Sequence, residues 1–543
     1  MIRKTFLTIA ALAALALSCI AGNDVKPTKN VIIMIPDGTS TGVLTASRWY
    51  KQYVGMDMKT LNLDPYLCGF VRSSLTDSPI VASSGAASAY MTGVITRANN
   101  ISTFPDENPN ASVEAIDKSK TFFPAATVME AAKIYRGKSV GVVATVEFPH
   151  ATPAACAAHA PSRNSYDVIA PQMTGLLDVA IAGGSKYMNG QCRANLEARG
   201  IPYVSDRAGF DALNGDKGWA LLAYKNLAYE IDRGETDEPS LAEMAAKAIE
   251  MLNRNKKGFV LMIEGSKVDY MAHSMDARGT ISEFLAFDEA VKVALDFAKK
   301  DGNTTVVILP DHGTSGMNIG NDRYSHYYER DLSSLFMGID RYKASCDVVA
   351  RRIETCEPER VKEIFMDLTG IELSDEQHAK LMRLKGVKEY DYMEIANSEN
   401  FNSYINKILN SKHHLGFVSG NHTGEDVFLA VYSPKGQRPE GWITNVQLNE
   451  YLCKVAGVKG KEAELNNTVF IPHNKLLEGL DFKMEDADKS IKQISWTDAA
   501  GRKVLVRQGE PWYTVDGVKK ELPVSAVYIK EIDSFFLPQS IVR

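Results

Sequence analysis

Histidine and carboxylate residues recur along the chain at spacings that suit metal binding. In VDYMAH, Asp269 and His273 lie four residues apart, so a helix there would place both side chains on one face. A carboxylate and an imidazole at this spacing can bind one divalent ion, although an isolated pair is at least as often a surface ion pair. The pair therefore becomes a metal-site candidate only together with further ligands.

Further candidate ligands lie at the ends of apolar runs or in short polar motifs. They are Asp37, Glu264, Asp311 and His312, together with His422 in the motif GNHTGED. Mixed histidine and carboxylate ligands favour zinc, whereas sets of oxygen ligands alone favour magnesium. These residue types predict a metal centre.

A candidate nucleophile opens the segment SSGAASAYMTG, residues 83–93. Ser83 precedes a run of small residues, which let the backbone approach a ligand closely, and the N-terminus of a helix favours an anion. The same composition also fits a packing helix that a serine caps. The segment by itself leaves both interpretations open.

The elements that must position these residues are near-continuous apolar runs, which suit parallel strands covered on both faces. They comprise residues 31–35, 139–145, 258–263 and 304–310. An amphipathic pattern over 281–302, stopped by Gly302, predicts a helix. Strands that alternate with helices predict an α/β fold, a three-layer α/β/α sandwich with a mostly parallel central sheet. In such sheets the chemistry gathers at the carboxyl ends of the strands.

Taken together, these motifs resemble the alkaline phosphatase family over residues 28–320 and 415–435. KNVIIMIPDG resembles the family's first metal-binding strand, and SSGAASAYMTG resembles its nucleophile helix. HATPAACAAHAPSRN resembles the block with a third-metal ligand and a phosphate-binding arginine. EGSKVDYMAH, PDHGT and GNHTGEDV resemble the remaining metal-binding blocks. Agreement of many blocks in the same order is far more specific than any one motif.

The resemblance implies hydrolysis of small phosphate monoesters through a phosphoseryl intermediate, with Ser83 as the nucleophile and Arg163 binding phosphate. It also implies two Zn²⁺ and one Mg²⁺ per chain, and a homodimer. The implied ligands of the first zinc are Asp269, His273 and His422. Those of the second zinc are Asp37, Asp311 and His312, with Ser83. The implied surroundings of the magnesium are Glu264, Thr152, Asp37 and His150.

Three positions depart from the family pattern. Ala82 stands where family members usually have an aspartate that orients the phosphate-binding arginine, so Arg163 is expected to be looser here or held by another group. His150 stands where some members have aspartate, which makes the third site less purely magnesium-like. Tyr270 replaces a basic residue of some relatives, so one auxiliary phosphate contact is expected to be missing.

Two other functions stay as alternatives, a phosphodiesterase and a non-catalytic metalloprotein, whereas a sulfatase does not fit. A phosphodiesterase of the same superfamily would keep the fold, but such enzymes often use threonine and lack the arginine at the position of Arg163. A sulfatase would need a C/S-x-P-S/A-R context around its nucleophile, and the residues after Ser83 do not provide it. A non-catalytic phosphate-binding metalloprotein would be expected to have lost a ligand or the nucleophile, and the sequence keeps them all.

The ends and the interior of the chain predict four parts. A basic start and an apolar run from Phe6 to Leu17 predict a signal peptide over 1–21, hence secretion across the inner membrane to the periplasm. Cys19 in Leu-Ser-Cys offers the alternative of a lipoprotein anchor, and no later run is long enough to span a bilayer. The remaining parts are a catalytic domain over 28–485, an inserted subdomain over 318–415 that includes a helix near 374–385, and a small β-rich extension over 490–543.

Charge and cysteine content exclude some partners and leave one question open. The chain of 543 residues has a net charge of −6, which provides no electrostatic basis for binding nucleic acid. An anionic substrate must therefore be attracted by a local positive site. Six cysteines follow the signal segment, and their spacing matches no zinc finger. Cys346 and Cys356 are close enough in sequence for a local disulfide, which the sequence does not decide.

Overall fold

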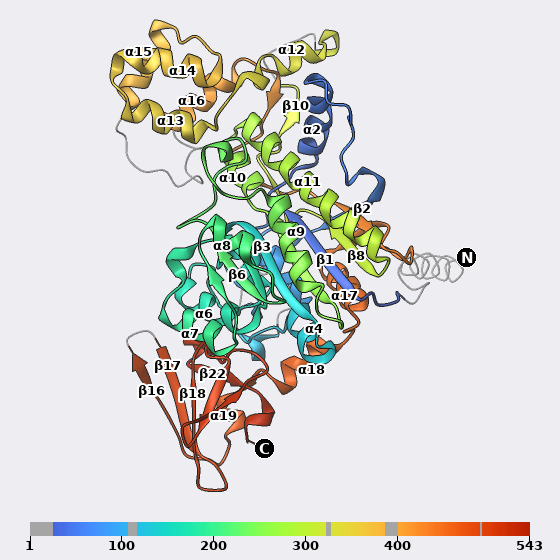
Figure 1. Cartoon of the computed structure of the whole chain (residues 1–543), viewed down its shortest axis with the longest axis vertical. Helices are drawn as coiled ribbons and strands as arrows, with labels where there is room; N and C mark the ends of the chain where they lie inside the picture. The colour runs from blue at the N-terminus through green and yellow to red at the C-terminus, as the bar shows by residue number, and fades with distance from the viewer. Residues whose placement is uncertain (1–24, 107–116, 322–326, 386–399, 489–490, 543) are drawn as a thin grey trace, which may run out of the picture.

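The computed structural model describes residues 25–106, 117–321, 327–385, 400–488 and 491–542. The signal peptide expected over 1–21, with Cys19, lies outside the described residues. Figure 1 shows a central sheet with helices around it, a helical lobe at the top and a β-rich unit at the bottom.

Ten strands form the central sheet, in the order β14-β2-β13-β8-β1-β7-β3-β4-β6-β5. Its middle consists of β8 (Thr304–Ile308), β1 (Asn30–Pro36), β7 (Phe259–Gly265) and β3 (Ser139–Glu147), which run parallel to one another. These four confirm the strands predicted from the apolar runs. Every residue in them is buried, which is why their sequences do not alternate between apolar and polar types.

The remaining strands extend the sheet on both sides. On one side follow β4 (Val179–Gly183), β6 (Gly218–Leu221) and β5 (Tyr203–Val204), all parallel. On the other side β13 (Val427–Tyr432) pairs antiparallel with both β8 and β2 (Leu67–Arg72), and β14 (Gly441–Thr444) pairs parallel with β2. The sheet is thus mostly parallel, as predicted.

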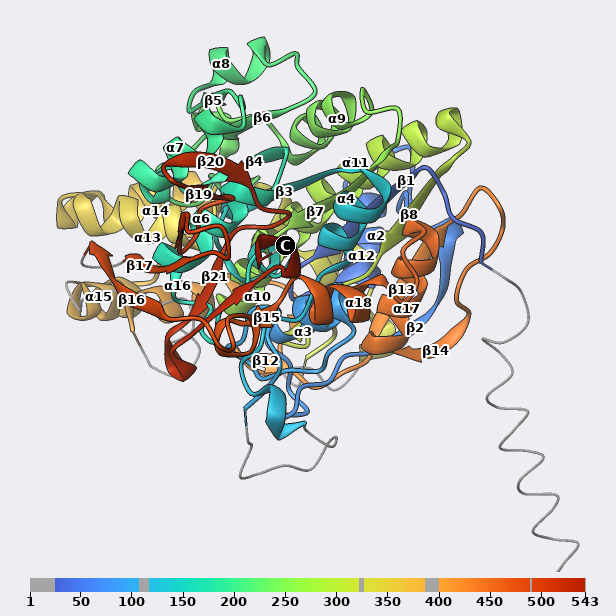
Figure 2. The same ribbon diagram turned by 90° about the horizontal axis from the view of Figure 1, so that it is seen from below.

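Helices cover both faces of the sheet (Figures 1 and 2). Ile32 and Met34 of β1 pack in one core with α2 (Thr41–Tyr53), α9 (Leu241–Leu252) and α11 (Ala277–Asp301). Val31 and Ile33 point to the other core, which contains α3 (Ser83–Thr92), α4 (Val128–Arg136), α6 (Tyr166–Leu176) and α17 (Asn445–Ala456). The predicted α/β/α sandwich is confirmed, and α11 confirms the predicted amphipathic helix.

The helical lobe lies between β10 (Asn318–Ile319) and β11 (Leu415–Gly416), which pair with each other antiparallel. It consists of α12 (Leu332–Phe336), α13 (Cys346–Thr355), α14 (Val361–Thr369), α15 (Asp375–Leu384) and α16 (Phe401–Asn410). The helix α15 confirms the one predicted near 374–385. Cys346 and Cys356 both have free thiols, so the local disulfide that the sequence left open is not formed.

The C-terminal unit contains a five-stranded sheet in simple sequence order. Its strands are β16 (Phe482–Asp488), β17 (Ile491–Thr497), β18 (Lys503–Arg507), β19 (Trp512–Val515) and β20 (Val518–Glu521). The sheet begins before residue 490, where the extension was expected to start, because β16 pairs with β17. A smaller sheet joins β15 (Ile471–Pro472), β22 (Ser534–Leu537) and β21 (Val527–Ile529). Among the described helices, none has the length and apolar character to cross a membrane.

Candidate metal and phosphate site

The carboxyl ends of the central strands bring the candidate residues to one edge of the sheet. Asp37 directly follows β1, Asp311 follows β8 after a short link, and Glu264 lies near the end of β7. The strands β1 and β7 pair in parallel with Ile35 opposite Glu264, so their carboxyl ends lie side by side at that edge. The helix α10 (Lys267–His273) begins just after β7, so its ligands are delivered to the same place.

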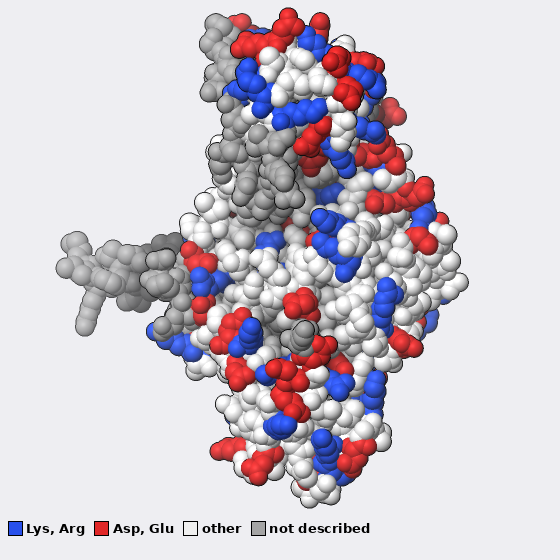
Figure 3. Space-filling model, turned by 90° about the vertical axis from the view of Figure 1, so that its left-hand side faces the viewer, with Lys and Arg blue, Asp and Glu red and all other residues white. Residues whose placement is uncertain are grey.

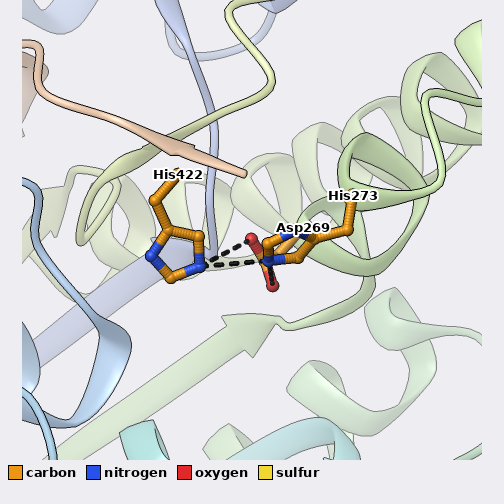
Figure 4. A group of neighbouring side chains, drawn as sticks. All are labelled: Asp269, His273 and His422. Carbon is orange, nitrogen blue, oxygen red and sulfur yellow. Dashed lines mark hydrogen bonds and ion pairs between the residues drawn. The ribbon is translucent and has the colours of Figure 1, made fainter. Parts of the chain in front are cut away.

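Asp269, His273 and His422 form the first group of ligands (Figure 4), with one ligand atom from each within 4.8 Å of the others. Nδ1 of His273 donates to the carbonyl oxygen of Gly420 (2.6 Å), and Nδ1 of His422 donates to that of Val81 (2.7 Å). A carbonyl only accepts, so both histidines carry the proton on Nδ1 and present a bare Nε2.

The two bare nitrogens face each other. Nε2 of His422 lies 3.0 Å from Nε2 of His273, and the Asp269 carboxylate is 3.4 Å from the latter. Two lone pairs and an anion at these distances repel one another unless a cation lies between them. The group therefore fits a bound divalent metal, and the nitrogen and oxygen donors suit zinc.

Asp37, Asp311 and His312 form the second group, again within 4.8 Å. Nε2 of His312 lies 3.5 Å from the Asp37 carboxylate, 3.3 Å from that of Asp311 and 3.2 Å from Oγ of Ser83. The imidazole rings of His312 and His422 stack at 3.9 Å between centroids, so the two groups are adjacent. The hydroxyl of Ser83 thus lies beside one candidate metal site and close to the other.

A third candidate site is made of oxygen atoms. Both carboxylate oxygens of Asp37 and of Glu264, and the hydroxyl of Thr152, are buried and have no hydrogen-bond partner among the described residues. Leaving such atoms unpaired is costly, and oxygen ligands are those that magnesium prefers. These atoms fit a hard divalent cation.

Buried negative charge dominates the electrostatics of the second and third sites. Burial, reinforced by neighbouring carboxylates, raises the pKa of Asp37 well above its usual range, that of Glu264 to about 8 and that of Asp311 to about 6. At neutral pH Asp37 and Glu264 therefore favour a bound proton unless a cation compensates their negative charge. Asp269 differs, because three histidines outweigh the effect of burial and lower its pKa to about 2.

Ser83 is the first residue of α3 and is buried, with Ala82 as the N-cap. The small residues of the helix permit its close packing, since a Cβ at Gly85 would overlap the side chain of Leu75. Ala82 offers no side-chain cap, so the backbone amides of the first turn keep their capacity to bind an anion.

Arg163 lies beside a histidine rather than an aspartate. Its Nη2 donates to Nε2 of His150 (3.1 Å), and the Tyr270 hydroxyl approaches the same nitrogen at 3.5 Å. Burial and the nearby guanidinium lower the pKa of His150 to about 3, so its imidazole is neutral and able to accept. In this chain, where Ala82 replaces the aspartate that usually orients the arginine, His150 contacts Arg163 instead.

Two side chains that support the ligands, those of Thr314 and Glu425, were not identified from the sequence. The Thr314 hydroxyl donates to Asp269 (2.6 Å). Glu425 accepts from Ser40 (2.7 Å) and from Thr423 (2.7 Å), which ties the loop after β1 to the loop of His422. Thr314 lies in the motif PDHGT and Glu425 in GNHTGED. The sequence therefore contained both residues within recognised motifs, but it did not indicate which side chains they contact.

Two further histidines, His413 and His414, are buried, with only 1% and 5% of their surface exposed. His414 precedes β11, where the chain returns from the helical lobe to the sheet, and packing at that junction buries both. They belong to neither group of candidate metal ligands found among the described residues.

A family model and several known proteins that are similar to this chain all point to one family. A family model described as alkaline phosphatase matches residues 28–458. Alkaline phosphatase 4 of Bacillus subtilis is 31% identical over 480 residues, which covers 83% of this chain and 97% of that protein. The crystal structure of a cold-active alkaline phosphatase from Shewanella aligns with a TM-score of 0.67 at 25% identity, over 78% of this chain and 99% of that one. The alkaline phosphatase of Thermus thermophilus has the same fold, with a TM-score of 0.69 over 80% of this chain and 93% of that one.

Proposed function

The chain belongs to the alkaline phosphatase family and hydrolyses phosphate monoesters, and from this premise we propose that the reaction passes through a phosphoseryl intermediate on Ser83. The observation that carries the proposal is the position of the Ser83 hydroxyl, 3.2 Å from Nε2 of His312 and beside two groups of metal ligands. A serine whose only role was to cap the helix would not need to lie beside two groups of metal ligands.

In the first step, Oγ of Ser83 attacks phosphorus and the bond to the alcohol oxygen breaks. In the second step, water attacks the phosphoserine, releases inorganic phosphate and restores the hydroxyl. The proton that Ser83 loses in the first step balances the one that the alcohol gains, and water returns a proton to Ser83 in the second step, so the sum is ester plus water to alcohol plus phosphate. Splitting one difficult displacement into two is the benefit of a covalent intermediate.

Arg163 would hold the non-reacting phosphate oxygens through its planar guanidinium, a geometry that lysine does not provide. His150 accepts from one of its nitrogens, which leaves the other donors of the fork for phosphate. The backbone amides at the start of α3 face the same anion. These residues neutralise and orient the ester while Ser83 attacks.

We assign two Zn²⁺ to the two mixed groups, the first of Asp269, His273 and His422 and the second of Asp37, Asp311 and His312. We assign one Mg²⁺ to the oxygen atoms of Glu264, Thr152 and Asp37, with His150 nearby. When bound, such ions withdraw charge from the phosphate and lower the pKa of the attacking hydroxyl. The unpaired buried oxygens and the facing imidazole nitrogens support this assignment.

The test is hydrolysis of 4-nitrophenyl phosphate at pH 7 to 10, with a chelator and then with zinc and magnesium restored. A phosphate diester and a sulfate ester serve as parallel substrates. We expect turnover that the chelator abolishes and zinc restores, far faster for the monoester, and a Ser83→Ala variant that keeps its metals but loses at least ~10³-fold in kcat. Equal turnover by Ser83→Ala would refute the phosphoseryl intermediate.

We further propose that the chain is exported and acts as a homodimer in the periplasm, either free or anchored through Cys19. The support is the N-terminal apolar run and the family resemblance. Mass spectrometry of the N-terminus of the mature protein distinguishes cleavage near Ala21 from a lipidated Cys19. Sedimentation equilibrium tests the dimer, and a single species of monomer mass at micromolar concentration would contradict it.

A further inference from the structure

The helical lobe contacts the turn that directly follows a candidate metal ligand. His273 is the last residue of α10, and residues 274–276 connect it to α11. We refer to these three residues as the α10–α11 turn. Figure 1 shows α13 and α16 on the side of the lobe that faces α10, and each residue of the turn accepts a hydrogen bond from one of these two helices.

Two asparagines of α16 bind backbone carbonyl groups of the turn. Nδ2 of Asn406 donates to the carbonyl oxygen of Ser274 (2.6 Å), and Nδ2 of Asn410 donates to that of Met275 (2.9 Å). Ser274 is the C-cap of α10, and the last carbonyl groups of a helix find no amide within the helix. The lobe therefore supplies donors that the end of α10 needs.

A third contact joins the turn to the start of α13. The backbone amide of Cys346 donates to Oδ2 of Asp276 (2.8 Å). Oδ1 of the same carboxylate accepts from the backbone amide of Gly279 (2.8 Å) and so caps α11. One buried side chain thus connects the beginning of α11 with the beginning of a lobe helix.

The middle residue of the turn has a strained backbone. Met275 has a φ of 53°, in the left-handed region that residues other than glycine seldom adopt. Such a conformation persists only where the surrounding structure holds it. The hydrogen bonds from Asn406, Asn410 and Cys346 hold the turn at this residue and on both sides of it.

The lobe also adjoins the other histidine of the first metal group. Gly420 and His422 lie in the segment that follows β11, where the chain leaves the lobe. The Gly420 carbonyl accepts from Nδ1 of His273, so this segment and the end of α10 meet at the metal ligands. Both imidazoles of the group are therefore carried by segments that the lobe holds.

Helix propensity does not explain the two asparagines. Asn406 and Asn410 are four residues apart and share one face of α16, and Asn406 is only 1% exposed. Asparagine forms helices less readily than alanine does, so these positions cost α16 some of its intrinsic stability. The hydrogen bonds to the α10–α11 turn are the compensating gain.

The outer surface of the lobe has a different character. Acidic and basic side chains are interspersed on it, at the top of Figure 3. On that face, mixed charge produces no field of one sign that would steer a charged ligand to the lobe. The contacts with the α10–α11 turn are therefore the feature that relates the lobe to the metal centre.

We propose that Asn406 and Asn410 are positioning residues for the first metal group. They fix the end of α10, so that the His273 imidazole faces the site before an ion binds. The inference rests on the proposed function, with its zinc ion at Asp269, His273 and His422, and adds two residues that tune the affinity for that ion. Loss of such outer contacts typically lowers metal affinity about 10- to 100-fold.

The experiment titrates the full metal-free protein with zinc at buffered free concentrations. The variant combines Asn406→Ala with Asn410→Ala. The matched control is Asn400→Ala, which removes the N-cap of the same helix, where Oδ1 accepts from the Ser403 amide (2.9 Å), and leaves the contacts with the turn in place. The control therefore reports what a weakened α16 does by itself.

We expect the variant to bind one zinc ion as tightly as the wild-type protein does and the other about tenfold more weakly. Its kcat should return to within about twofold of the wild-type value once zinc is saturating, because neither asparagine contacts the substrate. Asn400→Ala should bind both ions with wild-type affinity. If the double variant does not fold, Asn410→Ala alone, at the more exposed position, should still weaken one ion about threefold.

Wild-type affinity for both ions in the folded asparagine variant, or an equal loss in Asn400→Ala, overturns the proposal. Binding of fewer than two zinc ions by the wild-type protein would instead count against the proposed metal assignment. In that event, hydrogen exchange over residues 267–280 of the metal-free protein, measured by mass spectrometry, tests the positioning role. We expect faster exchange in the asparagine variant than in Asn400→Ala, and equal exchange would overturn the inference.

Discussion

Individual backbone carbonyls determine which imidazole atoms face the metal centre. The carbonyl oxygens of Gly420 and Val81 accept from Nδ1 of His273 and His422, which leaves both Nε2 atoms for a metal. Such outer contacts fix the tautomer and orientation of a ligand before the metal arrives. The centre is therefore preorganised at the level of single atoms.

Removal of one imidazole should cost one metal ion. We expect His422→Ala to lose about one equivalent of zinc per chain and at least ~100-fold in kcat/KM, because Asp269 and His273 alone leave the site two ligands short of four. His378→Ala is the control, since its imidazole is partly exposed in the helical lobe, where it contacts the carbonyl of Pro358, and it belongs to neither group of candidate ligands. Zinc content and turnover measured together decide the matter, and full zinc retention in His422→Ala would contradict the assignment.

Removal of the charge of Glu264 should weaken cation binding at the third candidate site. Glu264→Gln keeps the shape of the side chain but removes the negative charge that attracts a hard cation. We expect the variant to retain both zinc ions and to lose activation by magnesium, with kcat reduced about 10- to 100-fold. A magnesium titration of zinc-loaded protein measures this, and an unchanged activation curve would show that Glu264 is not a ligand.

At the scale of elements, the turns that leave the strands position the ligands. The turn after β1 contains Gly38 with φ of 63°, in the region that favours glycine. A Cβ there would overlap the carboxylate of Asp269 and the hydroxyl of Thr314. The turn and the helix α10 therefore meet so closely that only glycine fits between them.

A pair of glycine substitutions separates this contact from backbone strain. Gly38→Ala and Gly55→Ala both place alanine at positive φ, which costs about 1–2 kcal/mol, but a Cβ at Gly55 meets open space. We expect similar losses of unfolding free energy from strain alone and a loss of zinc and activity only in Gly38→Ala. Full zinc content in Gly38→Ala would show that α10 can move away without consequence.

Another buried acid, Glu462, belongs to α18 (Lys461–Thr468) and contacts two residues of α17. Oε2 of Glu462 accepts from the Cys453 thiol (2.9 Å) and Oε1 accepts from the Asn449 amide (3.0 Å). Burial raises the pKa of Glu462 to about 7, from an ordinary value of 4.5. The folded protein thus binds this proton more tightly than the unfolded chain does.

The raised pKa of Glu462 makes the folded state less stable as the pH rises. Stability from the protonated Glu462 is fully present below pH 4.5 and is lost as the pH rises through 7, by about 3 kcal/mol. Glu462→Gln cannot ionise, so its unfolding free energy relative to wild type should rise by that amount between pH 4.5 and 8. Urea denaturation at both pH values measures it, with the exposed Glu450→Gln as control. A pH-independent difference would mean that Glu462 ionises freely in the folded state.

At the scale of the whole molecule, the candidate metal site lies at one edge of a sheet that has a hydrophobic core on each face. Helices on both faces bury the central strands, and the metal candidates gather where those strands end, with the helical lobe beyond α10 (Figure 1). The C-terminal unit lies at the opposite end of the molecule. The buried carboxylates of the centre are therefore enclosed by the largest packed part of the protein.

Metal binding should stabilise this whole unit. A ligand that binds only the folded state adds about 2.7 kcal/mol when its free concentration is 100 times its Kd. We expect a chelator to lower Tm by several degrees and zinc with magnesium to restore it, because the ions neutralise Asp37, Glu264 and Asp311. Scanning calorimetry with metal analysis tests this, and an unchanged Tm after complete removal of the metals would refute the coupling.

The sequence alone determined much of this protein. The buried strands were predictable because continuous apolar runs are a local property, and the amphipathic period of α11 is equally local. The ligand motifs were readable because each lies within a few residues of an element's end. The resemblance then indicated which of those residues belong together.

The tertiary structure alone decided which atoms meet. The His422 imidazole is oriented by a carbonyl 341 residues away in the chain, at Val81, and no local pattern encodes that contact. The same holds for His150 beside Arg163 and for the burial of His413 and His414. Periodicity specifies which side of an element is buried, whereas long-range packing selects its partner, and the chemistry depends on the partner.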